Sequence, residues 1–139
     1  MRLLLVEDEP FIALDLQMLS TSAGHEVVGV ADSLESALHL AAARHPDAAL
    51  VDINLRDGLS GLRICEALSG GGRMAVGFVT GNAEQVPADF AGALAVLEKP
   101  FTQEGVQEIL GVLRDACRGE PRCAAPRYVR LAPGRPSGA

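Results

Sequence analysis

Acidic side chains follow two apolar runs of this 139-residue sequence. The run Leu3–Val6 leads directly into Glu7 and Asp8, and the run Ala48–Val51 leads into Asp52. If the fold brings the three carboxylates together, two of them about 4 Å apart repel by roughly 4 kcal/mol at an effective dielectric constant near 20. Such a cluster requires a cation, and all-oxygen ligands with room for water suit Mg²⁺. The pattern therefore predicts a divalent-cation site, provided that both runs are strands of one sheet.

Two further polar residues follow apolar runs in the same way. Thr80 follows Ala75–Val79, and Lys99 comes shortly after Leu94–Leu97. Lys99 is the only lysine of the chain, and the other eleven basic side chains are arginines. Because a compact ammonium group is not interchangeable with a planar guanidinium in a confined site, this single lysine is a candidate site residue.

The elements that must position these residues are short apolar runs alternating with helical patterns. Uniformly apolar runs are typical of strands buried on both faces of a parallel sheet. They cover Arg2–Val6, Glu26–Ala31, Ala48–Val51, Ala75–Val79 and Leu94–Leu97. Helical patterns cover residues 10–24, 33–44, 61–68 and 102–117, and a weaker one over 82–93 is interrupted by Pro87 and Gly92. In the first of them, Phe11, Leu14, Met18 and Leu19 stand at helical spacing and predict its apolar stripe.

This alternation predicts an α/β domain with a doubly wound, five-stranded parallel sheet. Right-handed crossovers leave few strand orders, and the flavodoxin-like order 2-1-3-4-5 is the common one for five strands. That order puts a ligand crevice at the carboxyl ends of strands 1 and 3. It also brings the polar residues after strands 1, 3, 4 and 5 to one rim.

Length and composition favour one globular domain, since 48% of the residues are hydrophobic. The apolar run after Arg2 is too short for a signal peptide, and no stretch approaches the roughly 20 apolar residues of a membrane span. We therefore expect a cytoplasmic protein without a membrane partner. Its cysteines, Cys65, Cys117 and Cys123, are expected to be reduced.

Charge divides the chain near residue 118. Residues 1–117 carry seven basic and seventeen acidic side chains, a net charge of −10, whereas residues 118–139 carry five arginines and one glutamate, a net charge of +4. The second part is rich in proline and glycine and has no apolar periodicity, so it is interpreted as a tail outside the core. We expect a domain over residues 1–117 and a tail over 118–139.

Four stretches of the domain resemble one known family. "VEDEP", "ALVDINLRDGLSGL", "VTGN" and "LEKPF", in that order, resemble the receiver domains of two-component response regulators. The resemblance covers essentially all of residues 2–117 and implies the receiver fold. It also implies that Asp52 accepts a phosphoryl group, that Asp8, Asp52 and the backbone carbonyl of Asn54 ligate Mg²⁺, and that Glu7 acts mostly through water.

The same resemblance assigns roles to the lysine and the threonine. Lys99 pairs first with the carboxylates and then with the phosphoryl group, while the Thr80 hydroxyl donates to a phosphoryl oxygen. The Lys99–Pro100 bond is expected to be cis, as it usually is in receivers. The phosphoryl donor is a sensor histidine kinase or a phosphotransfer protein. Apart from Mg²⁺-dependent self-phosphorylation and autodephosphorylation, no enzyme activity is expected.

The sequence departs from the family pattern at residues that change conformation on phosphorylation in receivers. Val96 stands where receivers often carry an aromatic residue that changes rotamer with the threonine. "FVTGN" is similar to a subgroup of stand-alone receivers with a Phe-Ala-Thr-Gly-type motif, with Val79 in the alanine place. Without the aromatic residue, activation is expected to order the segment 82–92 around Thr80 and Gly81.

Output is expected to pass through contacts with an unidentified protein target or through phosphate shuttling, because residues 118–139 are too few for an effector domain. The oligomeric state is open, a homodimer included. A receiver-fold adaptor that is never phosphorylated is the alternative function. A haloacid-dehalogenase-type phosphatase needs a second carboxylate two residues after the nucleophile, where this chain has Asn54. A flavodoxin-like FMN carrier needs a phosphate-binding loop after the first strand, where this chain has the acidic "EDE". Direct nucleic-acid binding through Arg118, Arg122, Arg127, Arg130 and Arg135 is disfavoured by the acidic domain.

Overall fold

The computed structural model describes residues 1–121 and 125–133. Its core is a six-stranded sheet with the order β2-β1-β3-β4-β5-β6. The strands are β1 (Arg2–Val6), β2 (Glu26–Ala31), β3 (Ala48–Val51), β4 (Ala75–Thr80), β5 (Ala95–Glu98) and β6 (Val129–Leu131). The first five are parallel, so the expected order 2-1-3-4-5 is confirmed. Arg122, Cys123 and Arg135 lie outside the described residues.

Strand β6 was not expected from the sequence. It pairs antiparallel with β5, with Val129 opposite Leu97 and Leu131 opposite Ala95. Val129 is 6% exposed and Ala132 is 7% exposed. The interpretation of residues 118–139 as a tail outside the core is therefore wrong for residues 129–132, because three residues are too short to show an apolar period.

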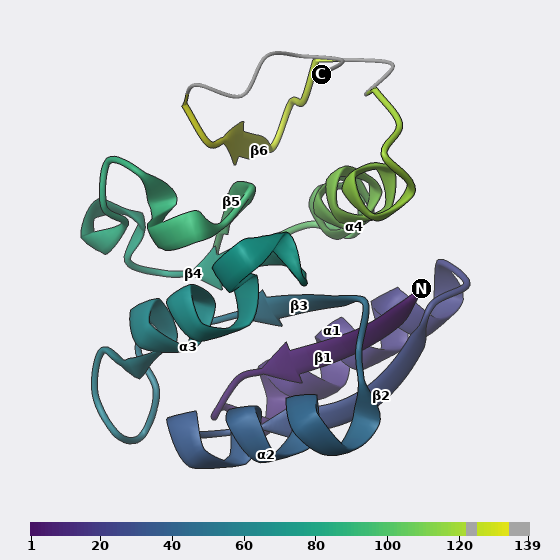
Figure 1. The fold of residues 1–139 in the computed structure, drawn as a ribbon. Helices are drawn as coiled ribbons and strands as arrows, with labels where there is room; N and C mark the ends of the chain where they lie inside the picture. The colour runs from purple at the N-terminus through teal and green to yellow at the C-terminus, as the bar shows by residue number, and fades with distance from the viewer. Residues whose placement is uncertain (122–124, 134–139) are drawn as a thin grey trace.

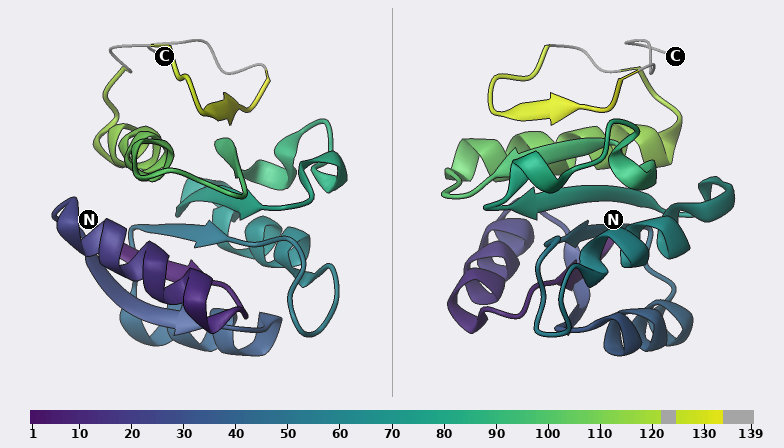
Figure 2. Two further views of the ribbon diagram at one scale, coloured as in Figure 1. Left: turned by 180° about the vertical axis from the view of Figure 1, so that it is seen from behind. Right: turned by 90° about the vertical axis from the view of Figure 1, so that its left-hand side faces the viewer.

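Helices cover both faces of the sheet (Figures 1 and 2). They are α1 (Pro10–Ser22), α2 (Leu34–Arg44), α3 (Ser60–Ser69) and α4 (Gln103–Arg118). Helices α2 and α3 pack on the face that carries Leu4, Val6 and Val51. Helices α1 and α4 pack on the opposite face, which carries Leu3, Leu5 and Leu50. Consecutive residues of β1 thus serve two cores, and this explains why the strand is uniformly apolar.

The apolar stripe of α1 lies on the surface. Phe11 is 85% exposed, Leu14 53% and Met18 61%. Helix α1 instead buries Ala13, Leu16 and Ser20. The expectation that Phe11, Leu14 and Met18 form the packed stripe is wrong, because the helix turns Ala13, Leu16 and Ser20 to the core; of the predicted stripe, Leu19 does pack against the core.

The connection from β4 to β5 contains no α-helix. It holds two 3₁₀ turns, Ala83–Gln85 and Phe90–Gly92, where the sequence indicated a weak fifth helix. Pro87 stands between the turns, and Gly92 has a φ of +93°. Phe90 and Ala91 also have positive φ angles, +57° and +52°. The interrupting residues therefore prevent a helix rather than merely shortening it.

Candidate functional site

Four neighbouring strands deliver the predicted site residues to one rim of the sheet. Backbone hydrogen bonds extend the ladder past the strand ends: the Glu7 amide donates to Ala31, the Asp52 amide to Val6 and the Lys99 amide to Thr80. The N···O distances are all 2.9 Å. Because the backbone at each of these residues is held by its neighbouring strand, the side chains leave the sheet at set positions.

Glu7, Asp8 and Asp52 form the acidic cluster that the sequence predicts. One carboxylate oxygen from each lies within 4.8 Å of those of the other two. The Lys99 ammonium lies between two of the carboxylates, 2.5 Å from Glu7 Oε1 and 2.9 Å from Asp52 Oδ2. The side chains of Glu7, Asp52 and Lys99 are only 2%, 9% and 15% exposed. One ammonium against three carboxylates leaves an excess of negative charge, and two of the three carboxylates are buried.

Burial and pairing act in opposite directions on the ionisable groups. Burial raises the pKa of Glu7, and the hydrogen bond from Lys99 only partly offsets this. For Lys99, burial lowers the pKa, but the hydrogen bonds from its ammonium to Glu7 and Asp52 outweigh that effect, so the pKa is raised overall. Lys99 therefore stays charged and is the internal counterion of the cluster.

One oxygen of Asp52 has no partner. Asp52 Oδ1 is buried and makes no hydrogen bond among the described residues, while Oδ2 accepts from Lys99. A buried carboxylate oxygen without a donor is costly, and a cation is the partner that this oxygen and the Asp8 carboxylate would share. The acidic donor set and the unpaired oxygen fit a hard divalent cation such as Mg²⁺.

Thr80 is fully buried at the end of β4. Its Oγ1 accepts a hydrogen bond from the Asn82 amide at 3.1 Å. Because the hydroxyl acts there as an acceptor, its own proton remains available to an acceptor at the rim. The bond between Lys99 and Pro100 is cis, as the resemblance implied.

Asn54, the remaining predicted ligand, lies on the loop between β3 and α3. Its side-chain amide donates to Gln85 Oε1 at 2.7 Å. This contact joins the loop after Asp52 to the first 3₁₀ turn after Thr80. Sequence reasoning did not single out Gln85, because 31 residues separate it from Asn54 and no motif contains both.

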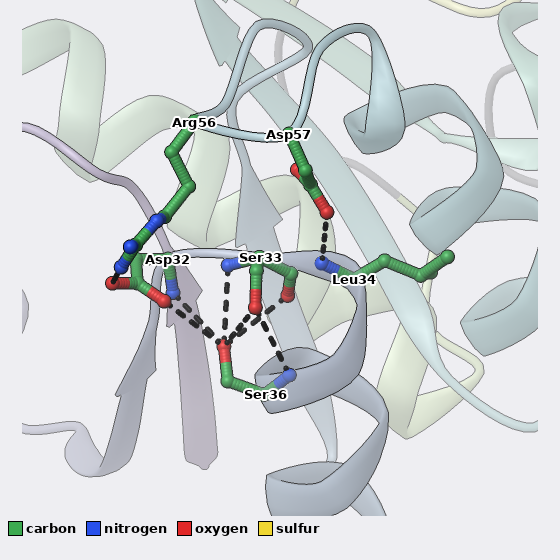
Figure 3. Close-up of polar contacts among 6 residues, drawn as sticks. All are labelled: Asp32, Ser33, Leu34, Ser36, Arg56 and Asp57. Carbon is green, nitrogen blue, oxygen red and sulfur yellow. Dashed lines mark hydrogen bonds and ion pairs between the residues drawn. The ribbon is translucent and has the colours of Figure 1, made fainter.

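A second set of polar contacts holds the same loop from the other side (Figure 3). Arg56 pairs with Asp32 at 2.7 Å, and Asp57 accepts from the Leu34 amide at 3.0 Å. Asp57 also accepts from Ser60. Leu55 and Gly58 close a turn around Asp57 by exchanging backbone hydrogen bonds. In addition, these contacts connect the loop after Asp52 to the start of α2.

Asp8→Ala should weaken Mg²⁺ binding without destabilising the metal-free protein. Asp8 is the most exposed of the three acids and has no hydrogen bond or ion pair among the described residues. We expect an affinity loss of about tenfold or more by calorimetric titration, because a ligand is lost. The metal-free melting temperature should stay equal or rise, because repulsion is relieved.

Asp15→Ala, an exposed acid of α1, is the matched control and should change neither quantity. A clear fall in the melting temperature of metal-free Asp8→Ala would show that Asp8 is chiefly structural.

Comparison with known proteins gives one consistent result. The family model described as the response regulator receiver domain matches residues 3–111. The phyllosphere-induced regulator PhyR of Methylorubrum extorquens is 34% identical over 110 residues, which are 78% of this chain and 41% of that protein.

Solved structures agree with this. The response regulator PhyR from Brucella abortus has a TM-score of 0.71 and 32% identity, over 81% of this chain and 46% of that one. The receiver domain of PhyR from Erythrobacter litoralis has a TM-score of 0.70 and 28% identity, over 85% of this chain and 89% of that one. The chain thus spans less than half of the two longer relatives. Among residues 1–121 and 125–133, no helix has the length and apolar character needed to cross a membrane.

Proposed function

Because the chain belongs to the response regulator receiver domain family, we propose that it is a single-domain response regulator that accepts a phosphoryl group on Asp52. The donor is a phosphohistidine of a sensor histidine kinase or a phosphotransfer protein. One observation carries the proposal: Asp52 is buried beside Lys99, and one of its carboxylate oxygens has no hydrogen-bond partner among residues 1–121 and 125–133.

The chemistry requires little of the protein except positioning and charge. A carboxylate oxygen of Asp52 forms a bond to phosphorus as the phosphorus–nitrogen bond of the donor breaks; the electron pair stays on that nitrogen, and the imidazole, protonated on its other nitrogen, leaves as the neutral ring. The Lys99 ammonium moves from Asp52 Oδ2 to a phosphoryl oxygen. The Thr80 hydroxyl donates its free proton to another phosphoryl oxygen, which holds the product.

Mg²⁺ is the cofactor of this proposal. It would be held by Asp8, Asp52 and the backbone carbonyl of Asn54, with Glu7 acting through water. When bound, it supplies positive charge to the carboxylates and to the phosphoryl oxygens. The chain's own contribution is the rigid spacing of these residues at the ends of β1 and β3.

Output is proposed to pass through a protein partner or through phosphate shuttling, in the cytoplasm. The chain is not proposed to be an enzyme that turns over external substrates. In the alternative function, the same fold acts as an adaptor without phosphorylation. The state of Asp52 separates the two proposals.

Intact-mass measurement tests phosphoryl acceptance. Incubation with Mg²⁺ and acetyl phosphate should increase the mass by about 80 Da, the addition of one phosphoryl group. The label should be absent when EDTA removes the metal, because the excess negative charge then repels the donor. A chain that stays unlabelled with Mg²⁺, acetyl phosphate and a panel of phosphorylated histidine kinases would favour the adaptor.

A further inference from the structure

The residues after α4 return to the sheet and cover its β5 edge. We call residues 127–132 the strap. Its strand β6 runs along β5, and the Ala132 amide donates to Leu94 at 2.9 Å. Figure 1 shows β6 beyond β5, beside α4. Without the strap, β5 would be an open edge strand beside the apolar side of α4, which is a surface that pairs readily with other strands.

One carboxylate of α4 holds the strap in place. Glu108 Oε2 accepts from the Arg127 amide at 2.9 Å. Glu108 Oε1 accepts from the amides of Tyr128 and Val129, at 2.8 and 2.9 Å. Hydrogen bonds to an ionised acceptor are stronger than neutral ones, so three on one carboxylate form a localised latch.

The strap also contacts the two segments that follow the phosphoacceptor partners. The Arg130 guanidinium lies 5.3 Å from the centre of the Phe90 ring, in the connection after Thr80. A cleft of about 340 Å³ is lined by Tyr128 and Arg130 and by the residues directly after Lys99, namely Pro100, Phe101 and Thr102. The strap therefore lies against residues that depend on the positions of both Thr80 and Lys99.

The connection after Thr80 contains two residues in the left-handed region. Phe90 and Ala91 are L-residues with φ angles of +57° and +52°. Such a backbone conformation is strained and persists only while its surroundings hold it. The contact of the Arg130 guanidinium with the Phe90 ring and the hydrogen bond from the Ala91 amide to Asp89 are among the contacts that do so.

We propose that the strap is an intramolecular cover of the β5 edge that phosphorylation of Asp52 releases, an inference that rests on the proposed function. Once the Thr80 side chain rotates to bring its hydroxyl to a phosphoryl oxygen, Oγ1 moves away from the Asn82 amide, which then loses its acceptor. The segment 82–92 then rearranges and withdraws Phe90 from Arg130. The released strap exposes the β5 edge, which takes an extended segment of a partner protein in its place.

Coupling of this kind is reciprocal. If phosphorylation loosens the strap by a given factor, loosening the strap must favour the phosphorylated state by the same factor. Variants of the strap contacts, which lie outside the phosphoacceptor site, must therefore change the affinity of that site.

Hydrogen exchange of the full chain, with and without Mg²⁺ and beryllofluoride as the phosphoryl mimic, tests the release. We expect exchange of the amides of residues 127–132 to become about tenfold faster with the mimic, within the usual range of coupling. A chain that binds no beryllofluoride contradicts the proposed function. A chain that binds it without any change over residues 127–132 overturns the strap proposal alone.

Glu108→Gln tests the latch. In the unmodified state it should speed exchange of residues 127–132, and it should tighten beryllofluoride binding, followed by fluorine NMR, by at most the factor by which beryllofluoride loosens the strap. Glu104→Gln is the matched control, since Glu104 is an exposed acid of the same helix. Faster exchange in Glu108→Gln with an affinity equal to that of the control would overturn the coupling.

Arg130→Gln removes the contact of the strap with Phe90 but leaves the contacts that hold the strap on β5. The variant keeps Glu108 and the β5 pairing, so it should fold and keep the strap in place. Exchange of residues 127–132 should then respond less to beryllofluoride than in the unchanged chain. An undiminished response would contradict the role of the Phe90 contact, and Arg63→Gln on α3 is the charge-matched control.

Discussion

Asp52→Asn is expected to abolish phosphoryl uptake completely while the domain stays folded. The substitution conserves the shape of a side chain that is 9% exposed. It removes the nucleophilic carboxylate, because an amide does not form the acyl phosphate. Lys99 keeps its second partner, Glu7, so the buried ammonium is not left alone. Loss of one charge from the cluster also relieves repulsion with Glu7.

The measurement is intact mass after incubation with Mg²⁺ and acetyl phosphate, with circular dichroism to follow the fold. Asp15→Asn makes the same chemical change on the exposed surface of α1 and should label like the unchanged chain. Normal labelling of Asp52→Asn would show that another residue is the acceptor and would sink the assignment.

Gly61→Ala is expected to have the largest effect on stability. A Cβ at this position would lie 2.5 Å from the Cα of Ile53 and 2.8 Å from the carbonyl carbon of Asp52. These neighbours are backbone atoms, so no side-chain rotation relieves the clash. The Gly61 amide also donates to Ile53 at 3.0 Å. Helix α3 must therefore move away from the phosphoacceptor loop, at a cost of about 3 kcal/mol or more in the free energy of unfolding.

Urea denaturation measures this cost. Gly111→Ala is the control, because a Cβ there meets nothing within 4 Å. In the middle of α4 that change should be neutral or stabilising by about 0.5–1 kcal/mol. The fraction of Gly61→Ala that stays folded should label more slowly than the unchanged chain, since Asp52 is displaced. Equal stability of Gly61→Ala and the unchanged chain would contradict the close backbone packing.

Much of the fold and the rim of the site can be predicted from the sequence, because both depend on local patterns. Uniformly apolar runs indicate strands buried on both faces, and the parallel order of the first five follows from the handedness of the crossovers. The residue after each run is then placed by the sheet itself. This is why Glu7, Asp52, Thr80 and Lys99 meet although up to 92 residues separate them.

Three features were decided only by tertiary packing. The apolar stripe of Phe11, Leu14 and Met18 is exposed, because helical spacing defines a face but not the face that meets the sheet. Strand β6 exists because the β5 edge offers it a partner. In the connection after Thr80, Pro87 and Gly92 already argue against a helix, but the positive φ angles of Phe90 and Ala91 appear only in the folded structure.

The sequence by itself determined the strand order, the family and the chemical types of the site residues, since each follows from residues adjacent in the chain or from sheet geometry. Only the tertiary structure decided which contacts hold those residues in place. Examples are Asn54 with Gln85, Arg56 with Asp32 and the Glu108 latch. These three contacts could not be predicted for the same physical reason. Exposed or half-exposed polar side chains show no periodicity along the sequence. Their partners are therefore set by the loops and helices that the packed core brings side by side.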